Sequence, residues 1–430
     1  MSQFQIILIS VFAFFIIVGV AMFAGYSNRN DASQTAGEVV IWGTMDRDIM
    51  EDVLKDLVAR DKAFEKVKYQ QQDEQNFDAL LTEALAEDGG PDVFLLSQAK
   101  ILKHQNKIVP IPYASFSERD FKDYFIREGE LYLVPEGVLA LPFLVDPLVM
   151  YWNRQIFTNA GLALAPKAWD EFFSFAKKVT ARDQNNNILT SAVALGGYAN
   201  INNAKEIITV LILQTGNPIA LKDGTQMKSA LKNFGTDKTA TAEAAVRFYT
   251  EFSDPVKETY SWHSALPNSK QAFLAGDLAL YFGFASELED LRSKNANLDF
   301  DVATLPQTNN LRNNLTFGKM QGLAISKKSK NVAGAFKTIS MLIQSEQLKV
   351  LGELTQLPPV ARGLLAVEPL DPYQYIFFKS ALAANAFLDP DEENMDLIFQ
   401  EMVEALISGK RSASEAVARA DDELNLLLNE

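Results

Sequence analysis

The side chains that most often carry out catalysis or bind metals are scarce in this sequence. It has no cysteine and only two histidines, His104 and His263. A thiol nucleophile, a disulfide and a cysteine zinc site are therefore excluded, and a histidine metal cluster is nearly excluded. Neither a G-x-S-x-G nucleophile elbow nor a phosphate-binding G-x-x-x-x-G-K-[ST] loop is present. With no compelling acid–base pair either, we expect a non-enzyme without a cofactor.

Two acidic or amide-rich segments could attract a cation. DQNNNI, residues 183–188, begins like a calcium loop, but Ile188 stands at the required glycine and Ala194 at the required bidentate glutamate. The run DPDEENMD, residues 389–396, fits an exposed helix start, where carboxylates favour the helix dipole. We expect no resident metal.

Loop aromatics are stronger candidates for binding chemistry. Trp262 stands between Ser261 and His263 in a polar loop that precedes the segment KQAFLAG. An exposed tryptophan in such a loop often contacts a ligand ring, and it equally often covers a packed surface. Both interpretations of Trp262 stay open.

Alternating strands and helices must position such residues. In the first part of the chain, short β-rich runs alternate with helical patterns, which predicts two β-α-β steps and a doubly wound lobe. In such sheets ligands lie beyond the carboxyl ends of the strands, so the loops at 43–47 and 97–100 are the first places to look. The predicted strands are GEVVIWG (37–43), KVKYQQQ (66–72) and PDVFLLS (91–97), and the predicted helices lie within 46–64 and 76–90.

The chain is too long for one hydrophobic core. Of its 430 residues, about 390 follow the N-terminal segment, and two lobes are expected. Helical stretches at 169–181 and 204–214 indicate the second lobe. Further on, residues 269–284 predict a helix, a stop at Gly276 and a strand.

The N-terminus predicts a membrane segment. Residues 4–24 are apolar or small, and the first charged side chain is Arg29. This stretch is long enough to cross a bilayer as one helix. A cleaved signal peptide is the alternative, but no basic residue precedes the apolar stretch and bulky Met22 lies three residues before the best cleavage point. We favour an uncleaved transmembrane anchor at 1–27 and a flexible tether at 28–37.

The net charge excludes one class of partner. The formal charge is −15 and the sequence pI is about 4.8. A basic face that would bind nucleic acid is therefore not expected.

Seven stretches in a fixed order give the soluble part a family resemblance. It resembles an extracellular solute-binding protein of the family 1 type, the binding component of ABC importers, in the class that includes maltodextrin-binding proteins. The stretches are EVVIWGTMD, GGPDVFLLS, ALPFLVDPLVMYWNRQIFTNAGLALAPKAWDEFFSFAKKVT, KQAFLAGDLALYFGF, DFDVATLP, GKMQGLAISKKSKNVAGAFKTISMLI and TQLPPVARGLL.

The resemblance implies an α/β fold of the type II periplasmic-binding-protein kind, with two lobes joined by hinge crossings and an extracytoplasmic location. It implies a small-molecule solute, bound between the lobes and passed to ABC permease subunits. By analogy, lobe one is 38–145 plus 303–357, and lobe two is 146–302 plus 358–430.

The resemblance also implies ligand contacts in lobe one. Asp46 and Arg47 match polar contacts to sugar hydroxyls, although both equally fit the solvated first turn of a helix. Ser97 and Gln98 follow the third strand. The neighbouring Leu96 and Ala99 stand where a maltodextrin binder has Trp and Asp, so the resemblance does not extend to that ligand.

In lobe two the resemblance implies one acidic and two aromatic contacts. Asp146 matches an acidic ligand contact, while Phe284 and Tyr198 match stacking residues. Phe282 lies on the same side of its strand as Phe284, because side chains alternate with period two. An aromatic residue in a strand can equally pack in a hydrophobic core, and that interpretation remains open for Phe282.

Together these residues predict a membrane-anchored, extracytoplasmic receptor for a sugar or oligosaccharide that serves an ABC importer. A tethered sensor or scaffold without transport is the alternative. A glycan-degrading hydrolase would need two carboxylates across the site.

Overall fold

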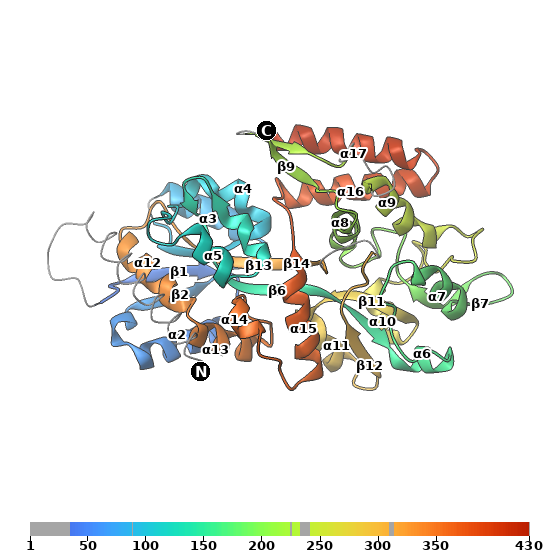
Figure 1. Cartoon of the computed structure of the whole chain (residues 1–430), viewed down its shortest axis with the longest axis horizontal. Helices are drawn as coiled ribbons and strands as arrows, with labels where there is room; N and C mark the ends of the chain where they lie inside the picture. Colours follow the sequence, from blue (N-terminus) through green and yellow to red (C-terminus); the bar gives the residue numbers. More distant parts are fainter. Residues whose placement is uncertain (1–34, 88, 224–225, 233–240, 309–313, 430) are drawn as a thin grey trace. The chain divides into compact units, whose positions relative to one another are not determined.

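The computed structural model describes residues 35–87, 89–223, 226–232, 241–308 and 314–429 (Figure 1). The predicted anchor at 1–27 and most of the tether at 28–37 lie outside these residues. None of the helices in the described ranges is long and apolar enough to cross a bilayer.

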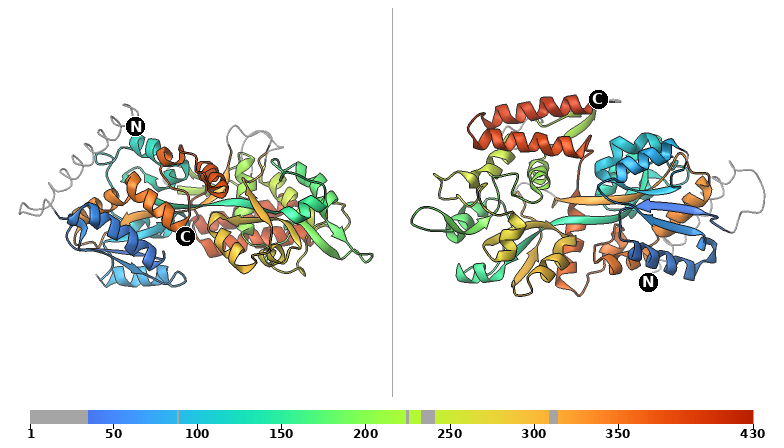
Figure 2. Two further views of the ribbon diagram at one scale, coloured as in Figure 1. Left: turned by 90° about the horizontal axis from the view of Figure 1, so that it is seen from below. Right: turned by 180° about the vertical axis from the view of Figure 1, so that it is seen from behind.

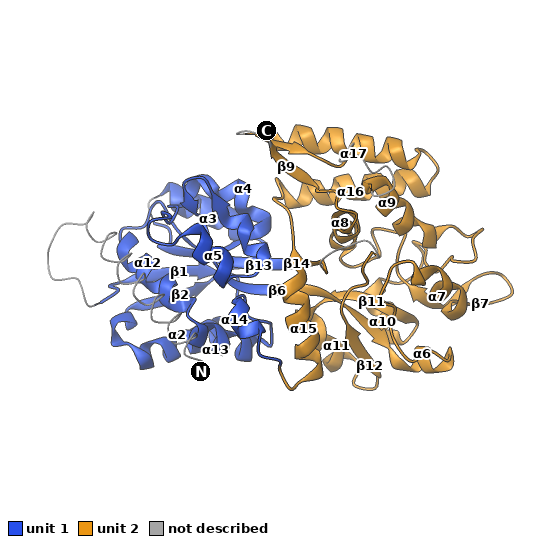
Figure 3. Ribbon diagram, in the orientation of Figure 1, with its two compact units in different colours: residues 1–145, 319–368 blue, residues 146–318, 369–430 orange. Residues whose placement is uncertain are grey.

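The chain divides into two compact units (Figure 3). Unit 1 is formed by Met1–Val145 and Lys319–Glu368, and unit 2 by Asp146–Gly318 and Pro369–Glu430. Two strands contain residues of both units: β6, Ala140–Asn153, and β13, Thr316–Ile325.

Unit 1 is built on three parallel strands in the order β2, β1, β3, with helices as connections. Strand β13 runs antiparallel to β3. The predicted β-α-β steps are confirmed. The bounds are β1 Val39–Gly43, α2 Arg47–Arg60, β2 Val67–Gln71, α3 Phe77–Ala86 and β3 Val93–Ser97.

The local sequence explains these elements. Helix α2 presents an apolar face that includes Met50, Val53 and Leu57, all fully buried. Strand β3 is apolar and buried from Val93 to Leu96, as expected for a parallel strand that is covered on both faces.

The remaining elements of unit 1 surround this sheet. Helix α12 contacts β1, and α13 contacts α2, where Gln347 donates to Asp56 over 2.7 Å. The bounds are α4 Ile101–His104, α5 Glu118–Tyr124, β4 Leu133–Val134, β5 Gly137–Val138, α12 Val332–Leu342, α13 Ser345–Thr355 and α14 Arg362–Leu365.

Unit 2 is centred on β11, Leu278–Phe284, which is buried along its whole length. It runs antiparallel to β6 and parallel to β8. The preceding helix α10, Ser269–Ala275, ends at Gly276, whose φ of 85° suits glycine. The predicted helix, stop and strand at 269–284 are therefore confirmed.

Helices cover the sheet of unit 2, and α16 and α17 pack on each other as a pair that is visible in each view (Figure 2). The bounds are α6 Arg154–Asn159, α7 Glu171–Val179, β7 Ala181–Arg182, β8 Ile188–Val193, α8 Ala204–Gln214, β9 Ala220–Asp223, β10 Gln226–Ser229, α9 Ala242–Thr250, α11 Leu288–Lys294, β12 Phe300–Ala303, α15 Pro372–Ala383, β14 Ala384–Asn385, α16 Glu392–Ile407 and α17 Ala413–Leu428.

Candidate ligand-binding site

Asp46 and Arg47 lie at the start of α2 in unit 1. One Asp46 carboxylate oxygen accepts the backbone N–H groups of Asp48 and Ile49, at 2.9 and 3.3 Å, and so caps the helix. Arg47 pairs with Glu51, one turn further along the exposed surface. The helix-start interpretation accounts for both side chains, and their contact with a ligand stays a prediction.

Ser97 and Gln98 form a tight turn after β3. Gln98 is 3% exposed, and its Oε1 accepts the backbone N–H of Met320 in β13 at 2.9 Å. Ser97 accepts the N–H of Ala99. The turn is therefore joined to the neighbouring strand β13 through the side chain of Gln98.

Directly after this turn lies a charged cluster that the sequence analysis missed. Asp78 in α3 accepts hydrogen bonds from His104 Nε2 at 2.9 Å and from Lys103 at 2.7 Å. His104 is 1% exposed, and its Nδ1 faces the ammonium of Lys107 at 3.2 Å. Since an ammonium only donates, Nδ1 is the acceptor and Nε2 carries the hydrogen. His104 and Lys103 together hold the pKa of Asp78 well below its usual range.

In unit 2, one loop contacts several of the predicted site residues. This loop, residues 196–203 with the sequence GGYANINN, is called the asparagine loop below. Its Asn200 accepts the indole N–H of Trp262 at 3.2 Å. Its Asn202 exchanges hydrogen bonds with Ser269, at the start of α10. Its Asn203 donates to the carbonyl oxygen of Phe282 at 3.1 Å.

Trp262 is 1% exposed. Of the two interpretations left open, this burial favours a packed surface, and the backbone explains the burial. The N–H groups of Ser261 and Trp262 both donate to Phe252, while the Ser261 hydroxyl bonds with both backbone groups of Val193 in β8. These bonds hold the segment against the sheet.

Tyr198 and Phe282 are also buried. The Tyr198 hydroxyl donates to Asp396 of α16 at 2.8 Å, and burial together with this bond raises the pKa of the hydroxyl. Phe282 is 2% exposed and stacks on Phe172, with centroids 6.3 Å apart, and it also contacts Trp169. Phe282 thus belongs to an aromatic core, and its contact with a ligand stays a prediction.

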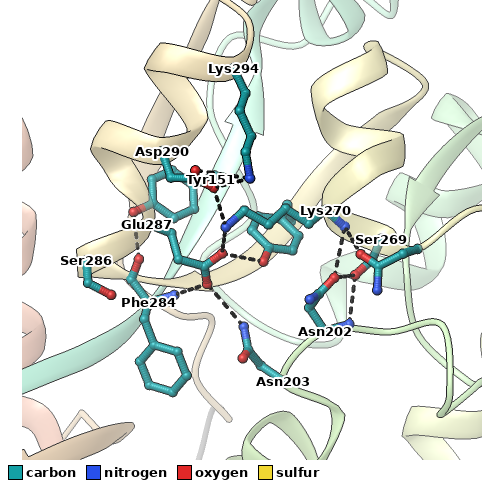
Figure 4. A network of polar contacts seen from close by, with 12 residues as sticks. Tyr151, Asn202, Asn203, Ser269, Lys270, Phe284, Ser286, Glu287, Asp290 and Lys294 are labelled. Carbon is teal, nitrogen blue, oxygen red and sulfur yellow. Dashed lines mark hydrogen bonds and ion pairs between the residues drawn. The ribbon is translucent and has the colours of Figure 1, made fainter. Parts of the chain in front are cut away.

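Asp146 bonds to the turn that follows Phe284 at the end of β11; Figure 4 shows Phe284 and Ser286 of this turn. Asp146 accepts the backbone N–H of Ser286 at 3.0 Å. The carbonyl oxygen of Phe284 accepts the Tyr151 hydroxyl at 2.8 Å. The Phe284 ring is 3% exposed and makes an edge contact with Phe317. The structure therefore places Asp146 at the turn that follows Phe284.

Glu287 is the polar centre of this turn, and sequence reasoning missed it. Its carboxylate accepts the Phe284 N–H at 2.9 Å, the Tyr281 hydroxyl at 2.8 Å and the Lys270 ammonium at 2.7 Å. It also accepts from Asn203 at 3.3 Å. The available signal was a glutamate three residues after the strand end, the spacing with which a side chain returns to a helix start.

The chemistry of this region suits an uncharged polar ligand. Amide and carboxylate groups surround an aromatic turn, and such groups hydrogen-bond hydroxyls. The nearby cation Lys270 already pairs with Glu287 and with Asp290, the latter at 2.8 Å. Within the described ranges, no group of three or more His, Asp or Glu side chains is placed to hold a metal ion.

Comparisons with known proteins give a consistent match. The sequence profile of bacterial extracellular solute-binding proteins matches residues 61–374. The diacetylchitobiose binding protein DasA of Streptomyces coelicolor is 24% identical over 277 residues. That alignment covers 63% of this chain and 61% of the relative, which is less than two thirds of the relative's length.

Solved structures share the fold. A cyclo/maltodextrin-binding protein in complex with maltotetraose superposes with a TM-score of 0.72 at 14% identity, covering 93% of this chain and 97% of the other. UgpB from Mycobacterium tuberculosis, in complex with glycerophosphocholine, has a TM-score of 0.69 at 17% identity, covering 91% and 98%. The predicted α/β, two-lobed periplasmic-binding-protein-like fold is confirmed.

Proposed function

This chain belongs to the family of bacterial extracellular solute-binding proteins, and we propose that it captures a neutral sugar or oligosaccharide outside the cytoplasm and delivers it to an ABC importer. The observation that carries the proposal is the turn after β11. There Asp146 places a carboxylate at the same turn as the aromatic side chain of Phe284, and Glu287 holds that turn in place. Sugars present hydroxyls to such carboxylates and apolar ring faces to aromatic side chains.

Known relatives support this class of ligand. DasA is described as a diacetylchitobiose binding protein, and the cyclo/maltodextrin-binding protein was solved with maltotetraose. The glycerophosphocholine complex of UgpB provides the second candidate, a phosphodiester. A phosphodiester needs an available cation, and Lys270 at this turn is already engaged by two carboxylates. We therefore place the neutral sugar first.

The proposal includes the location and the partner. Residues 1–27 anchor the protein in the cell membrane, uncleaved, and a permease on the same membrane receives the solute. The lobes are 38–145 plus 303–357 and 146–302 plus 358–430. The proposed ligand contacts are Asp46, Arg47, Ser97, Gln98, Asp146, Tyr198, Trp262, Phe282 and Phe284.

A thermal-shift screen of the full chain in mild detergent tests the ligand class. The panel contains maltotetraose, diacetylchitobiose, glycerophosphocholine, amino acids, polyamines and peptides. A ligand at 100 times its dissociation constant stabilises the folded state by about 2.7 kcal/mol, which raises the melting temperature visibly. We expect a shift with a saccharide and a smaller one in Asp146→Ala. A shift with glycerophosphocholine alone would favour the phosphodiester.

A further inference from the structure

The geometry points to Asn203 as an additional ligand-binding residue, whose side-chain oxygen accepts a hydroxyl hydrogen of the sugar and whose orientation is set by Glu287. This inference rests on the proposed function and extends the site to a residue that neither the sequence motifs nor the family resemblance indicated. It is carried by the backbone, the amide contacts and the location of Asn203.

The backbone of Asn203 has an unusual conformation. With φ 59° and ψ 29°, it is left-handed, directly before helix α8. Glycine adopts this conformation freely, and asparagine tolerates it better than most residues do. Non-glycine residues held in this region often lie at functional sites. Here an amide side chain stands where glycine would be the least strained choice.

The amide contacts fix which end of the side chain faces the turn. Asn203 Nδ2 donates to the Phe282 carbonyl oxygen at 3.1 Å and to Glu287 Oε1 at 3.3 Å. Both partners only accept, so the nitrogen must face them and the oxygen must point away. Within the described part of the chain, no group donates a hydrogen bond to Asn203 Oδ1. The side chain does not cap α8 either.

Glu287 determines this orientation. Its carboxylate is held by Phe284 N–H, the Tyr281 hydroxyl and Lys270, so it presents a fixed acceptor to Asn203. In Figure 4, the Asn203 amide and the Phe284 ring lie on the same side of the Glu287 carboxylate. Asn203 is half-buried and Phe284 is covered, so the amide is an accessible polar group beside the aromatic turn.

These observations define a chemical role. An uncommitted carbonyl oxygen next to an aromatic side chain accepts from a sugar hydroxyl, whereas it repels a phosphate oxygen. Asn203 thus adds selectivity for a neutral polyhydroxyl ligand, with Glu287 as a positioning residue.

The substitution Asn203→Gly isolates the amide, because glycine retains the left-handed backbone and removes only the side chain. Asn186→Gly is the matched control. Asn186 is also left-handed, with φ 64°, in the turn after β7. Calorimetric titration of the full chain with maltotetraose and with diacetylchitobiose gives the dissociation constant for each variant. We expect Asn203→Gly to weaken binding of the recognised saccharide by about tenfold and Asn186→Gly to leave it unchanged.

Each outcome separates the inference from the proposed function. If the unsubstituted protein binds a saccharide and Asn203→Gly binds it equally well, Asn203 is not a ligand contact and the proposed function stands. Equal weakening by both glycine variants would show a general effect of the substitution and overturn the inference. If the unsubstituted protein binds neither saccharide, the proposed function fails, and the inference fails with it.

A double-mutant cycle tests the positioning role of Glu287. If Glu287 acts through Asn203, Glu287→Gln weakens binding in the unsubstituted protein but adds little in the Asn203→Gly background. Additive losses would show that Glu287 acts independently of Asn203, which contradicts the positioning role. If Glu287 had a purely structural role, Glu287→Gln would lower the melting temperature, but its effect on binding would not depend on the presence of the Asn203 side chain.

Discussion

Trp262 and Trp42 each donate an indole N–H to an amide oxygen, but their surroundings differ. Trp262 is 1% exposed and bonds Asn200 at 3.2 Å. Trp42 bonds Gln70 at 2.7 Å on the exposed surface. We predict that Trp262→Phe lowers the free energy of unfolding by about 2 kcal/mol, because a smaller ring replaces the buried indole and the half-buried Asn200 oxygen loses its donor. Urea unfolding, followed by circular dichroism, measures the loss.

Trp42→Phe is the control for that prediction. Water replaces the lost indole bond at the surface, so we expect a change within about 0.5 kcal/mol. Equal losses in the two variants would contradict the assignment of Trp262 to the interior of unit 2.

At the residue scale, the sequence predicted where candidate site residues lie better than it predicted what their side chains do. Asp46 was correctly expected in the loop after the first strand, but a helix cap and a ligand contact share the same pattern. The polar flanks of Trp262 left exposure and packing equally open, because its backbone bonds to Phe252 are invisible in the sequence. The Asn203–Glu287 contact joins residues 84 positions apart, and no local pattern encodes such a distance.

Two ion clusters connect helices and have opposite pH dependence. In the first, Asp78 of α3 binds His104 and Lys103 beside α4. These partners lower the pKa of Asp78, so its contribution to stability is present above the ordinary carboxyl pKa and is lost as the pH falls. We predict that Asp78→Asn costs about 2 kcal/mol at pH 7 and progressively less as the pH falls below about 4. A pH-independent difference in urea unfolding would refute this.

The second cluster joins α8 to the segment before α16. Asp389 is 4% exposed and lies 3.4 Å from the Lys205 ammonium. Burial raises the pKa of Asp389 to about 6, although Lys205 opposes the shift. The folded state therefore binds this proton more tightly than the unfolded chain does. Its stabilising contribution is complete below about pH 4 and is lost as the pH rises through about 6.

Comparison with Asp389→Asn isolates that contribution. Relative to this variant, we expect the unsubstituted protein to lose up to about 3 kcal/mol of stability between pH 4 and pH 7.5. Urea unfolding at the two pH values measures the difference. A relative stability that rises with pH would mean that Lys205 outweighs burial and lowers the pKa of Asp389 instead.

At the element scale, the strong periodic patterns were sufficient to predict the order of the strands and helices. The parallel strands of unit 1 and the α10–Gly276–β11 segment have the predicted order. The β9–β10 hairpin was missed, although its Asp223-Gly224 pair is a hairpin signal. Strand β14 is two residues long and pairs with distant β13, so its own sequence contains no pattern that predicts it.

At the scale of the whole molecule, length alone predicted two lobes, and the resemblance predicted the fold that the structural comparisons confirm. The lobe boundaries and the anchor stay predictions. We expect the full chain to sediment with membranes of the producing bacterium and a variant lacking residues 1–27 to remain in the supernatant after ultracentrifugation. Recovery of the full-length protein in the supernatant, at its intact mass, would contradict a membrane anchor.

The central claim is that this receptor binds a neutral saccharide. Calorimetric titration of the full chain with maltotetraose and diacetylchitobiose, against glycerophosphocholine, tests it most directly. We predict saturable heat with one binding site for a saccharide and none for glycerophosphocholine. Saturable heat with glycerophosphocholine, and none with either saccharide, would contradict the account.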